Sequence, residues 1–176
     1  YQGPNRPARY FEGWYYKIVT PTRAFALIPG VSRAESDPHA FVQYIEGTQG
    51  SAAYHRYDIG AFQYGRDEFW AAVGENRFSL EAVTARLPNL SVDLTVTNSL
   101  LWRGTLVQPG TMGWYSFVPF MECKHGIIVM DAVVTGEING EPAEGRLYVE
   151  KDYGRSFPHA WIWLQSNSFS EPGVSV

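Results

Sequence analysis

The sequence predicts an all-β protein that folds as one antiparallel barrel or one strongly bent sheet. Period-two alternation of apolar and polar residues recurs along the chain and is clearest in 91–97, where Val92, Leu94 and Val96 would face a core. Aromatic residues, which favour strands, make up 15% of the chain. No long stretch carries the sustained apolar stripe of a helix.

Short segments with strand composition follow one another, and turn residues separate most of them. We expect strands at residues 10–19, 24–28, 40–45, 69–73, 78–83, 91–97, 126–138, 145–150 and 160–167. Pro29–Gly30 should end the second strand, Asn139–Gly140 should form a tight hairpin turn, and 98–107 has room for one helical turn. Barrels of about eight such strands can hold one small ligand, so the predicted architecture is a lipocalin-like barrel.

Length, charge and cysteine content narrow the class of protein. A chain of 176 residues with 45% hydrophobic content can bury a substantial core. The net charge of -4 and the scattered Lys and Arg residues argue against a nucleic-acid partner and favour a neutral or apolar ligand. The single cysteine, Cys123, excludes an intrachain disulfide framework, so we expect a cytoplasmic protein. Residues 1–172 should form one domain, and 173–176 read as the start of a second.

The first predicted strand places a carboxylate beside aromatic side chains. Alternation puts Glu12 on the same face as Trp14 and Tyr16. If that face is the barrel interior, burial would raise the pKa of Glu12 and make it a usable proton donor. If the face is outside, Glu12 would pair with a Lys or Arg residue.

The last predicted strand, 160–167, has an aromatic and amide face made of Trp161, Trp163, Gln165 and Asn167. The amides could fix the polar end of a ligand whose apolar body rests on the tryptophans. Alternatively, the amides bond the neighbouring backbone and the tryptophans belong to the core.

The corner before that strand concentrates charge. Asp152 and Arg155 would form an ion pair there, whereas an Asp152 turned towards an aromatic pocket would act as an acid. Glu122, Cys123 and His125, with His39 elsewhere, could bind a metal or form a nucleophile and its base. Their spacing matches no structural zinc site, so no metal site is predicted.

Three separated stretches resemble the signature regions of the tocopherol cyclase family. They read Tyr10-Phe11-Glu12-Gly13-Trp14-Tyr15-Tyr16-Lys17, Met112-Gly113-Trp114-Tyr115-Ser116-Phe117-Val118-Pro119-Phe120-Met121-Glu122-Cys123, and Glu150-Lys151-Asp152-Tyr153-Gly154-Arg155-Ser156-Phe157-Pro158 followed by Trp161-Ile162-Trp163-Leu164-Gln165-Ser166-Asn167. Members are longer than this chain. The resemblance therefore implies the first of two lipocalin-like halves, whose partner is the C-terminal half of the same protein.

The resemblance also implies a reaction, which is closure of a chromanol ring from a prenylated hydroquinone in vitamin E biosynthesis. A proton is added to the prenyl double bond and the phenol oxygen captures the cation, so no cofactor is needed. Glu12 or Asp152 would supply the acid. Trp14, Trp161 and Trp163 would form an aromatic wall, with Arg155, Gln165 and Asn167 as further binding residues.

Two other functions fit the same residues. A carrier of a hydrophobic isoprenoid or quinone would need the aromatic cavity but no buried acid, and a hydratase would add water to the isoprenoid double bond. Such apolar ligands also imply peripheral contact with a membrane.

Overall fold

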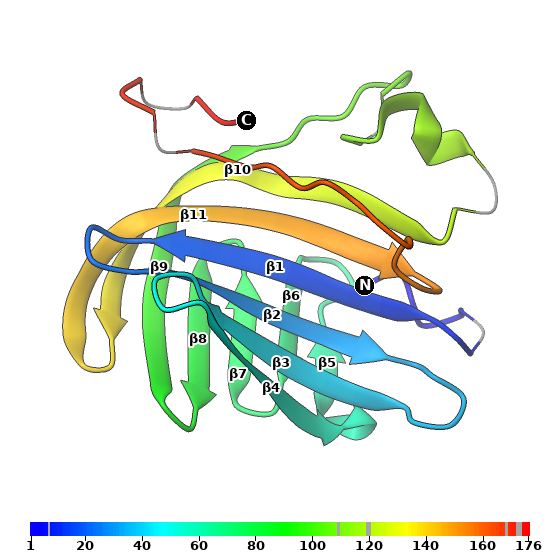
Figure 1. Ribbon diagram of the computed structural model, residues 1–176, viewed down its shortest axis with the longest axis horizontal. Coiled ribbons are helices and arrows are strands. Elements are labelled where there is room, and N and C mark those ends of the chain that lie inside the picture. The colour runs from blue at the N-terminus through cyan, green and yellow to red at the C-terminus, as the bar shows by residue number, and fades with distance from the viewer. Residues whose placement is uncertain (7, 109, 119–120, 168, 172–173) are drawn as a thin grey trace.

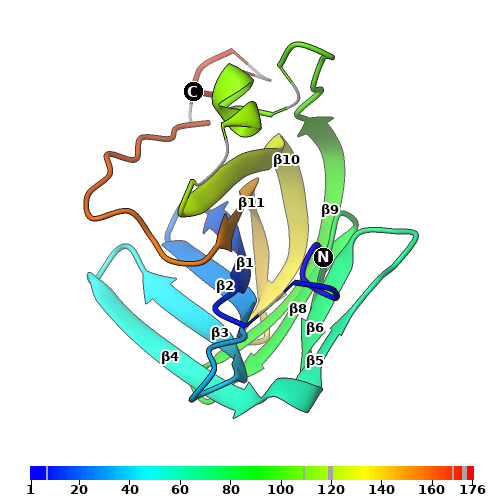
Figure 2. The ribbon, with the colours of Figure 1, turned by 90° about the vertical axis from the view of Figure 1, so that its right-hand side faces the viewer.

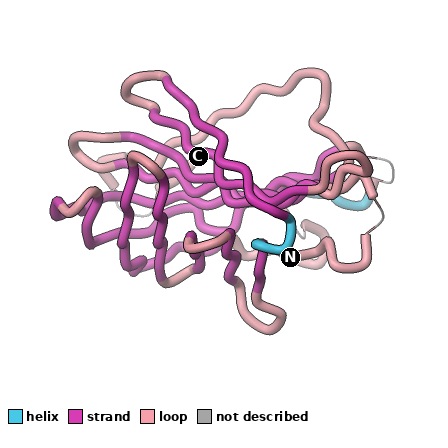
Figure 3. The backbone as a smooth tube through the Cα atoms, turned by 90° about the horizontal axis from the view of Figure 1, so that it is seen from below, coloured by secondary structure: helices cyan, strands magenta, loops and turns pink. Residues whose placement is uncertain are grey.

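The computed structural model describes residues 1–6, 8–108, 110–118, 121–167, 169–171 and 174–176. The described residues form eleven strands in a single antiparallel sheet. In chain order these are β1 (Phe11–Val19), β2 (Ala24–Ser32), β3 (His39–Glu46), β4 (Ser51–Asp58), β5 (Phe62–Tyr64), β6 (Trp70–Val73), β7 (Asn76–Ser79), β8 (Ala82–Leu87), β9 (Leu90–Leu101), β10 (Cys123–Ile138) and β11 (Glu141–Gly154). Two short 3-10 turns accompany them, η1 (Ile59–Ala61) and η2 (Gly113–Phe117), and Figure 3 shows how little of the chain is helical.

The sheet curls into a nearly closed barrel of the predicted lipocalin-like kind (Figures 1 and 2). The strand order is β4-β3-β2-β1-β11-β10-β9-β8-β7-β6-β5. The first and last strands of the chain therefore pair with each other, and the gap lies between β4 and β5, which η1 connects. The strands β1, β11 and β10 form the continuous wall that carries the candidate site.

The interior of the barrel is a packed hydrophobic core. Alternation along β1 points Trp14, Tyr16 and Ile18 inwards, and each is at most 1% exposed. The Tyr16 hydroxyl crosses the interior and donates to the Ser79 carbonyl oxygen at 3.2 Å, which ties β1 to β7. The opposite face of the same strands looks outwards, and we call these the inner and outer faces below.

Several local predictions differ from the structure. Pro29–Gly30 does not end β2, because Gly30 pairs with Gly13 on one side and with Phe41 on the other. A side chain at position 30 would clash with the Phe41 ring, so glycine permits the close approach of these strands. The predicted helical turn in 98–107 was also wrong, because β9 extends to Leu101 and the rest is loop.

Other elements were predicted incompletely. The edge strand β4 was missed because its residues are mostly exposed and lack an apolar face. The hairpin at Asn139–Gly140 is confirmed, and both residues have positive φ, 55° and 80°, as a type I′ turn requires. The expected domain boundary at 172/173 lies outside the described residues. None of the helical turns in the described part of the chain has the length to cross a membrane.

Candidate active site

The outer face of β10 and β11 carries a compact group of ionisable side chains. In the antiparallel register His125 lies opposite Asp152, and Glu150 is two residues before Asp152 on the same face. On the other side of β11, Tyr15 of β1 lies opposite Glu150. Because β11 is hydrogen-bonded to β1 on one side and to β10 on the other, the backbone that carries these side chains is held rigidly.

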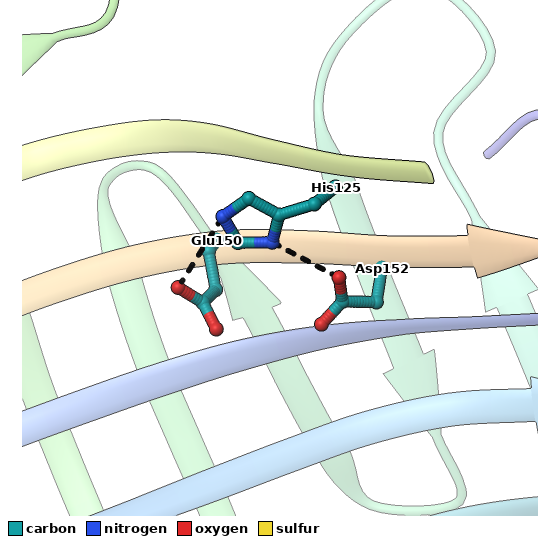
Figure 4. Close-up of side chains that lie close together, drawn as sticks. All are labelled: His125, Glu150 and Asp152. Carbon is teal, nitrogen blue, oxygen red and sulfur yellow. Dashed lines mark hydrogen bonds and ion pairs between the residues drawn. The ribbon is translucent and has the colours of Figure 1, made fainter. Parts of the chain in front are cut away.

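The imidazole of His125 lies between the two carboxylates (Figure 4). Its Nδ1 is 3.0 Å from Asp152 Oδ1, and its Nε2 is 3.9 Å from Glu150 Oε2. Glu150 Oε2 also accepts hydrogen bonds from the Tyr148 hydroxyl at 2.7 Å and from Trp163 Nε1 at 2.9 Å. Glu150 is only 4% exposed, so its carboxyl group is almost removed from water.

Burial and hydrogen bonding shift the proton affinities of this group. Burial raises the pKa of Glu150 above its ordinary value, although the hydrogen bonds from Tyr148 and Trp163 act in the opposite direction. The hydrogen bond to Asp152 raises the pKa of His125, and burial opposes it. The arrangement therefore favours proton retention on both Glu150 and His125 at a higher pH than either group would show in water.

Residues 160–167 form a strap across the outer face, and we use this name for the segment below. The strap runs back along the outside of the barrel wall after β11 ends (Figure 1). Trp163 meets Tyr15 edge to face, with ring centroids 5.5 Å apart. Ile162 and Leu164, between the sheet-facing residues, are 97% and 79% exposed. The strap thus covers Glu150 with an indole ring and presents apolar side chains to the outside.

Polar contacts fasten the strap to all three strands. Lys17 Nζ of β1 donates to Gln165 Oε1 at 2.7 Å. Asn167 Nδ2 donates to Asp131 Oδ1 of β10 at 3.1 Å and to the Leu147 carbonyl oxygen of β11 at 3.4 Å. Asp131 and Asn167 are 3% and 6% exposed, so this fastening is buried.

The part of the chain that carries this group matches a known protein family. The model of the tocopherol cyclase-like family matches residues 88–176, which include β9, β10, β11 and the strap. The chain belongs to the tocopherol cyclase-like family. The three ionisable residues His125, Glu150 and Asp152 of the outer-face group all lie within the match.

Two plant relatives of this tocopherol cyclase-like chain are matched over a shorter region. A probable chloroplastic tocopherol cyclase of Oryza sativa subsp. japonica is 38% identical over 71 residues, which is 38% of this chain and 15% of the rice protein. The chloroplastic tocopherol cyclase of Zea mays is 38% identical over 73 residues, 39% of this chain and 15% of the maize protein. The matched region is thus a small part of either relative.

A solved structure has a similar fold. The putative AttH of Nitrosomonas europaea has a TM-score of 0.51 with 13% sequence identity, and the match covers 85% of this chain and 52% of that one. At this identity the likeness concerns the fold alone.

The two acids predicted from the tocopherol cyclase resemblance lie on opposite faces of the wall. Asp152 is on the outer face beside His125, whereas Glu12 is fully buried on the inner face. Glu12 Oε1 lies 3.1 Å from Lys151 Nζ, and Glu12 Oε2 accepts from the Tyr10 hydroxyl at 2.5 Å and from Gln2 N at 2.9 Å. Lys151, Tyr10 and Gln2 all donate to Glu12, so the Glu12 carboxylate oxygens act as acceptors in these contacts.

The residues predicted to bind substrate are likewise divided between the inside and the outside of the barrel wall. Trp14 lies inside the barrel, so it does not share a wall with Trp161 or Trp163. Trp161 is 63% exposed and packs near Phe157, at 5.4 Å between ring centroids. Arg155 is exposed, and within the described residues Asp152 pairs with His125 rather than with Arg155.

The prediction of a strand at 160–167 was wrong, since this segment lies outside the sheet. Sequence reasoning also missed His125 and Glu150 as partners. The alternation of Tyr148, Glu150 and Asp152 along one strand face was the available signal, but the position of His125 depends on the β10–β11 register. Donor atoms of His125, Glu150 and Asp152 lie within 4.8 Å of one another and could also hold a metal ion.

Proposed function

We propose that this chain carries the acid site of an intramolecular cyclase that converts a prenylated hydroquinone to a chromanol. Glu150 is the proton donor in this proposal. The observation that supports it is a carboxyl group 4% exposed, with a raised pKa, that accepts a hydrogen bond from the indole N–H of Trp163. A carrier would have no need of such a group, because burying an ionisable side chain costs free energy and carboxyl groups with raised pKa values are typical of catalytic sites.

The proposed reaction begins with transfer of the Glu150 proton to the less substituted carbon of the prenyl double bond. A C–H bond forms, the π bond breaks, and a tertiary cation remains on the neighbouring carbon. The phenol oxygen of the same molecule then forms the C–O bond and loses its proton to the Glu150 carboxylate. The acid is restored, the product is an isomer of the substrate, and no electrons are exchanged with a cofactor.

Aromatic and amide groups around Glu150 support this chemistry. The ring faces of Trp163 and Tyr15 can stabilise a cation that forms beside them. Gln165 Nε2 is buried and makes no hydrogen bond within the described part of the chain, so it is available to a quinol oxygen. The amide of Asn167 already donates to Asp131, so we assign Asn167 to fastening the strap.

His125 and Asp152 have positioning roles in the proposal. Asp152 accepts a hydrogen bond from His125 Nδ1, which directs Nε2 towards Glu150 at 3.9 Å. An imidazole so placed can exchange the proton of Glu150 with solvent between turnovers, because His125 is less buried than Glu150.

The proposal also includes a partner that covers the strap. The exposed apolar side chains of Ile162 and Leu164 suit a covering partner, and we propose the C-terminal half of the same protein for that role. The match to only 52% of the AttH chain is compatible with a fold of two such halves. Peripheral contact with a membrane would bring a prenylated substrate to this side of the molecule.

The test is incubation of the complete protein with a prenylated hydroquinone, followed by chromatography and mass spectrometry. Cyclisation yields a new compound of unchanged mass that has lost the prenyl double bond. A product heavier by one water would indicate hydration instead. Saturable binding without any product, across several prenyl lengths, would replace the proposal with a carrier function.

A further inference from the structure

The N-terminal segment places an aromatic ring inside one end of the barrel. Figure 2 looks into this end and shows the start of the chain lying within the rim. The Tyr1 ring packs against Phe62 and Tyr64 of β5, with centroid distances of 5.0 Å and 4.6 Å. A phenol side chain therefore occupies an aromatic mouth at the edge of the core.

Polar contacts hold this segment in place. The backbone N–H of Gln2 donates to the buried Glu12 carboxylate at 2.9 Å. Arg33 Nη1 donates to the Gly3 carbonyl oxygen at 2.5 Å; burial raises the pKa of the Tyr1 phenol, and the positive charge of the same guanidinium lowers it. The mouth thus supplies both a ring surface and a cationic donor for a hydroxyl group.

One donor in this region has no partner. Trp14 is 1% exposed, yet its Nε1 makes no hydrogen bond to the described residues. Its ring stacks on Phe62, the residue that also contacts Tyr1, at 6.1 Å between centroids. A buried N–H without an acceptor is unfavourable, and a bound molecule with an oxygen atom would relieve it.

The mouth can also be reached from solvent. A depression lies next to Tyr64 and is lined in addition by Gly65, Arg66, Asp67, Glu68 and Trp70. A small molecule can therefore reach the Tyr64 ring from solvent.

From these contacts we propose that the mouth is a ligand site for a small phenol, which takes the place of Tyr1. The ring would pack against Phe62 and Tyr64 as the Tyr1 ring does, edge to face and tilted, and its oxygen would accept from the nearby Arg33 guanidinium. The site lies on the inner side of the wall and Glu150 on the outer side. The proposal is thus independent of the cyclase chemistry.

Calorimetry with p-cresol, which has the ring and hydroxyl of tyrosine, tests the site in the complete protein. The wild type should bind p-cresol weakly but saturably, and toluene should compete poorly because it lacks the hydroxyl. Tyr1→Ala should bind p-cresol about tenfold tighter or more, because the internal competitor is gone. Tyr54→Ala is the matched control, since Tyr54 stacks on Phe41 at the surface, and it should bind as the wild type does.

A tyrosine deletion could by itself create a cavity, so a second readout uses the wild type. Hydrogen exchange at the Gln2 amide should accelerate when p-cresol saturates the protein, because displacement of Tyr1 frees that N–H from Glu12. Toluene should leave the exchange unchanged. Unaltered Gln2 protection at p-cresol saturation, or equal affinities of Tyr1→Ala and Tyr54→Ala, would overturn the proposal.

The role of Trp14 is tested in the Tyr1→Ala background. Replacing Trp14 by Phe removes the N–H while keeping an aromatic ring, and p-cresol affinity should fall about fivefold. An unchanged affinity would overturn a hydrogen bond from Trp14 to the ligand.

Discussion

His125 Nδ1 lies 3.0 Å from Asp152 Oδ1 across the β10–β11 ladder, and this contact raises the pKa of the imidazole above its ordinary 6.5. Asp152→Asn should lower the pKa of His125, as measured by NMR of the imidazole protons. Asp93→Asn, which changes a surface ion pair with Arg86, serves as the control and should leave the His125 pKa unchanged. Equal His125 pKa values in both variants would contradict the account.

The same contact makes stability depend on pH. Because the folded state raises the pKa of His125, its contribution is fully present below the unfolded pKa near 6.5 and is lost as pH rises through the folded value. Urea unfolding should therefore give a lower free energy of unfolding above that range than below it. His125→Asn should abolish this part of the pH dependence, and a wild-type curve identical to that of His125→Asn would refute the prediction.

Trp163 should tune the acid. Its N–H bond to Glu150 lowers the pKa of that carboxyl, so Trp163→Phe should raise the pKa further while keeping an aromatic ring. Since the acid must be protonated, kcat/KM should fall at a higher pH in Trp163→Phe than in the wild type. Trp161→Phe is the control, because Trp161 is 63% exposed, and its profile should match the wild type. A profile that does not move in Trp163→Phe would remove Glu150 from the titrating step.

The inner-face pair of Glu12 and Lys151 should stabilise the fold rather than serve the chemistry. Glu12→Gln leaves the largely buried Lys151 ammonium without its counter-charge and should cost about 3 kcal/mol in urea unfolding. The double change with Lys151→Met should recover part of that loss. Glu35→Gln, at the exposed Arg9 pair, should cost almost nothing. Similar losses in Glu12→Gln and Glu35→Gln would contradict this role.

Asn167 should hold the strap down. Asn167→Ala removes the hydrogen bonds to Asp131 and to the Leu147 carbonyl oxygen. Hydrogen exchange over residues 161–167 should then accelerate, and turnover should fall because Trp163 no longer covers Glu150. Gln63→Ala, at an exposed position on β5, should change neither quantity. Unaltered strap exchange in Asn167→Ala would show that other contacts carry the attachment.

The two faces of β1 could be predicted from the sequence, but the strap that covers the outer face could not. The alternation of Glu12, Trp14 and Tyr16 predicted that these residues share one face, and they do. Alternation cannot show that a later segment returns over the opposite face. The Trp and amide spacing of 160–167 suggested a strand, although its side chains alternate between sheet and exterior without joining the ladder.

The contact between His125 and Asp152 could not be predicted from the pattern of neighbouring residues in the sequence. These residues are far apart in the chain and meet only because β10 and β11 pair in one register, which has irregularities near Val129. A shift of that register by one residue would place His125 on the other face. Asp152 could therefore be named from sequence as an acid candidate, whereas its partner required the folded sheet.

Turnover of a prenylated hydroquinone by Glu150→Gln is the most direct test of the central claim. A general acid contributes about 100-fold to 10,000-fold, so the variant should lose at least that much activity while retaining its fold and substrate binding. Any loss in Glu12→Gln should instead follow its loss of folded protein. Full turnover by a folded Glu150→Gln protein would contradict the assignment of Glu150 as the proton donor.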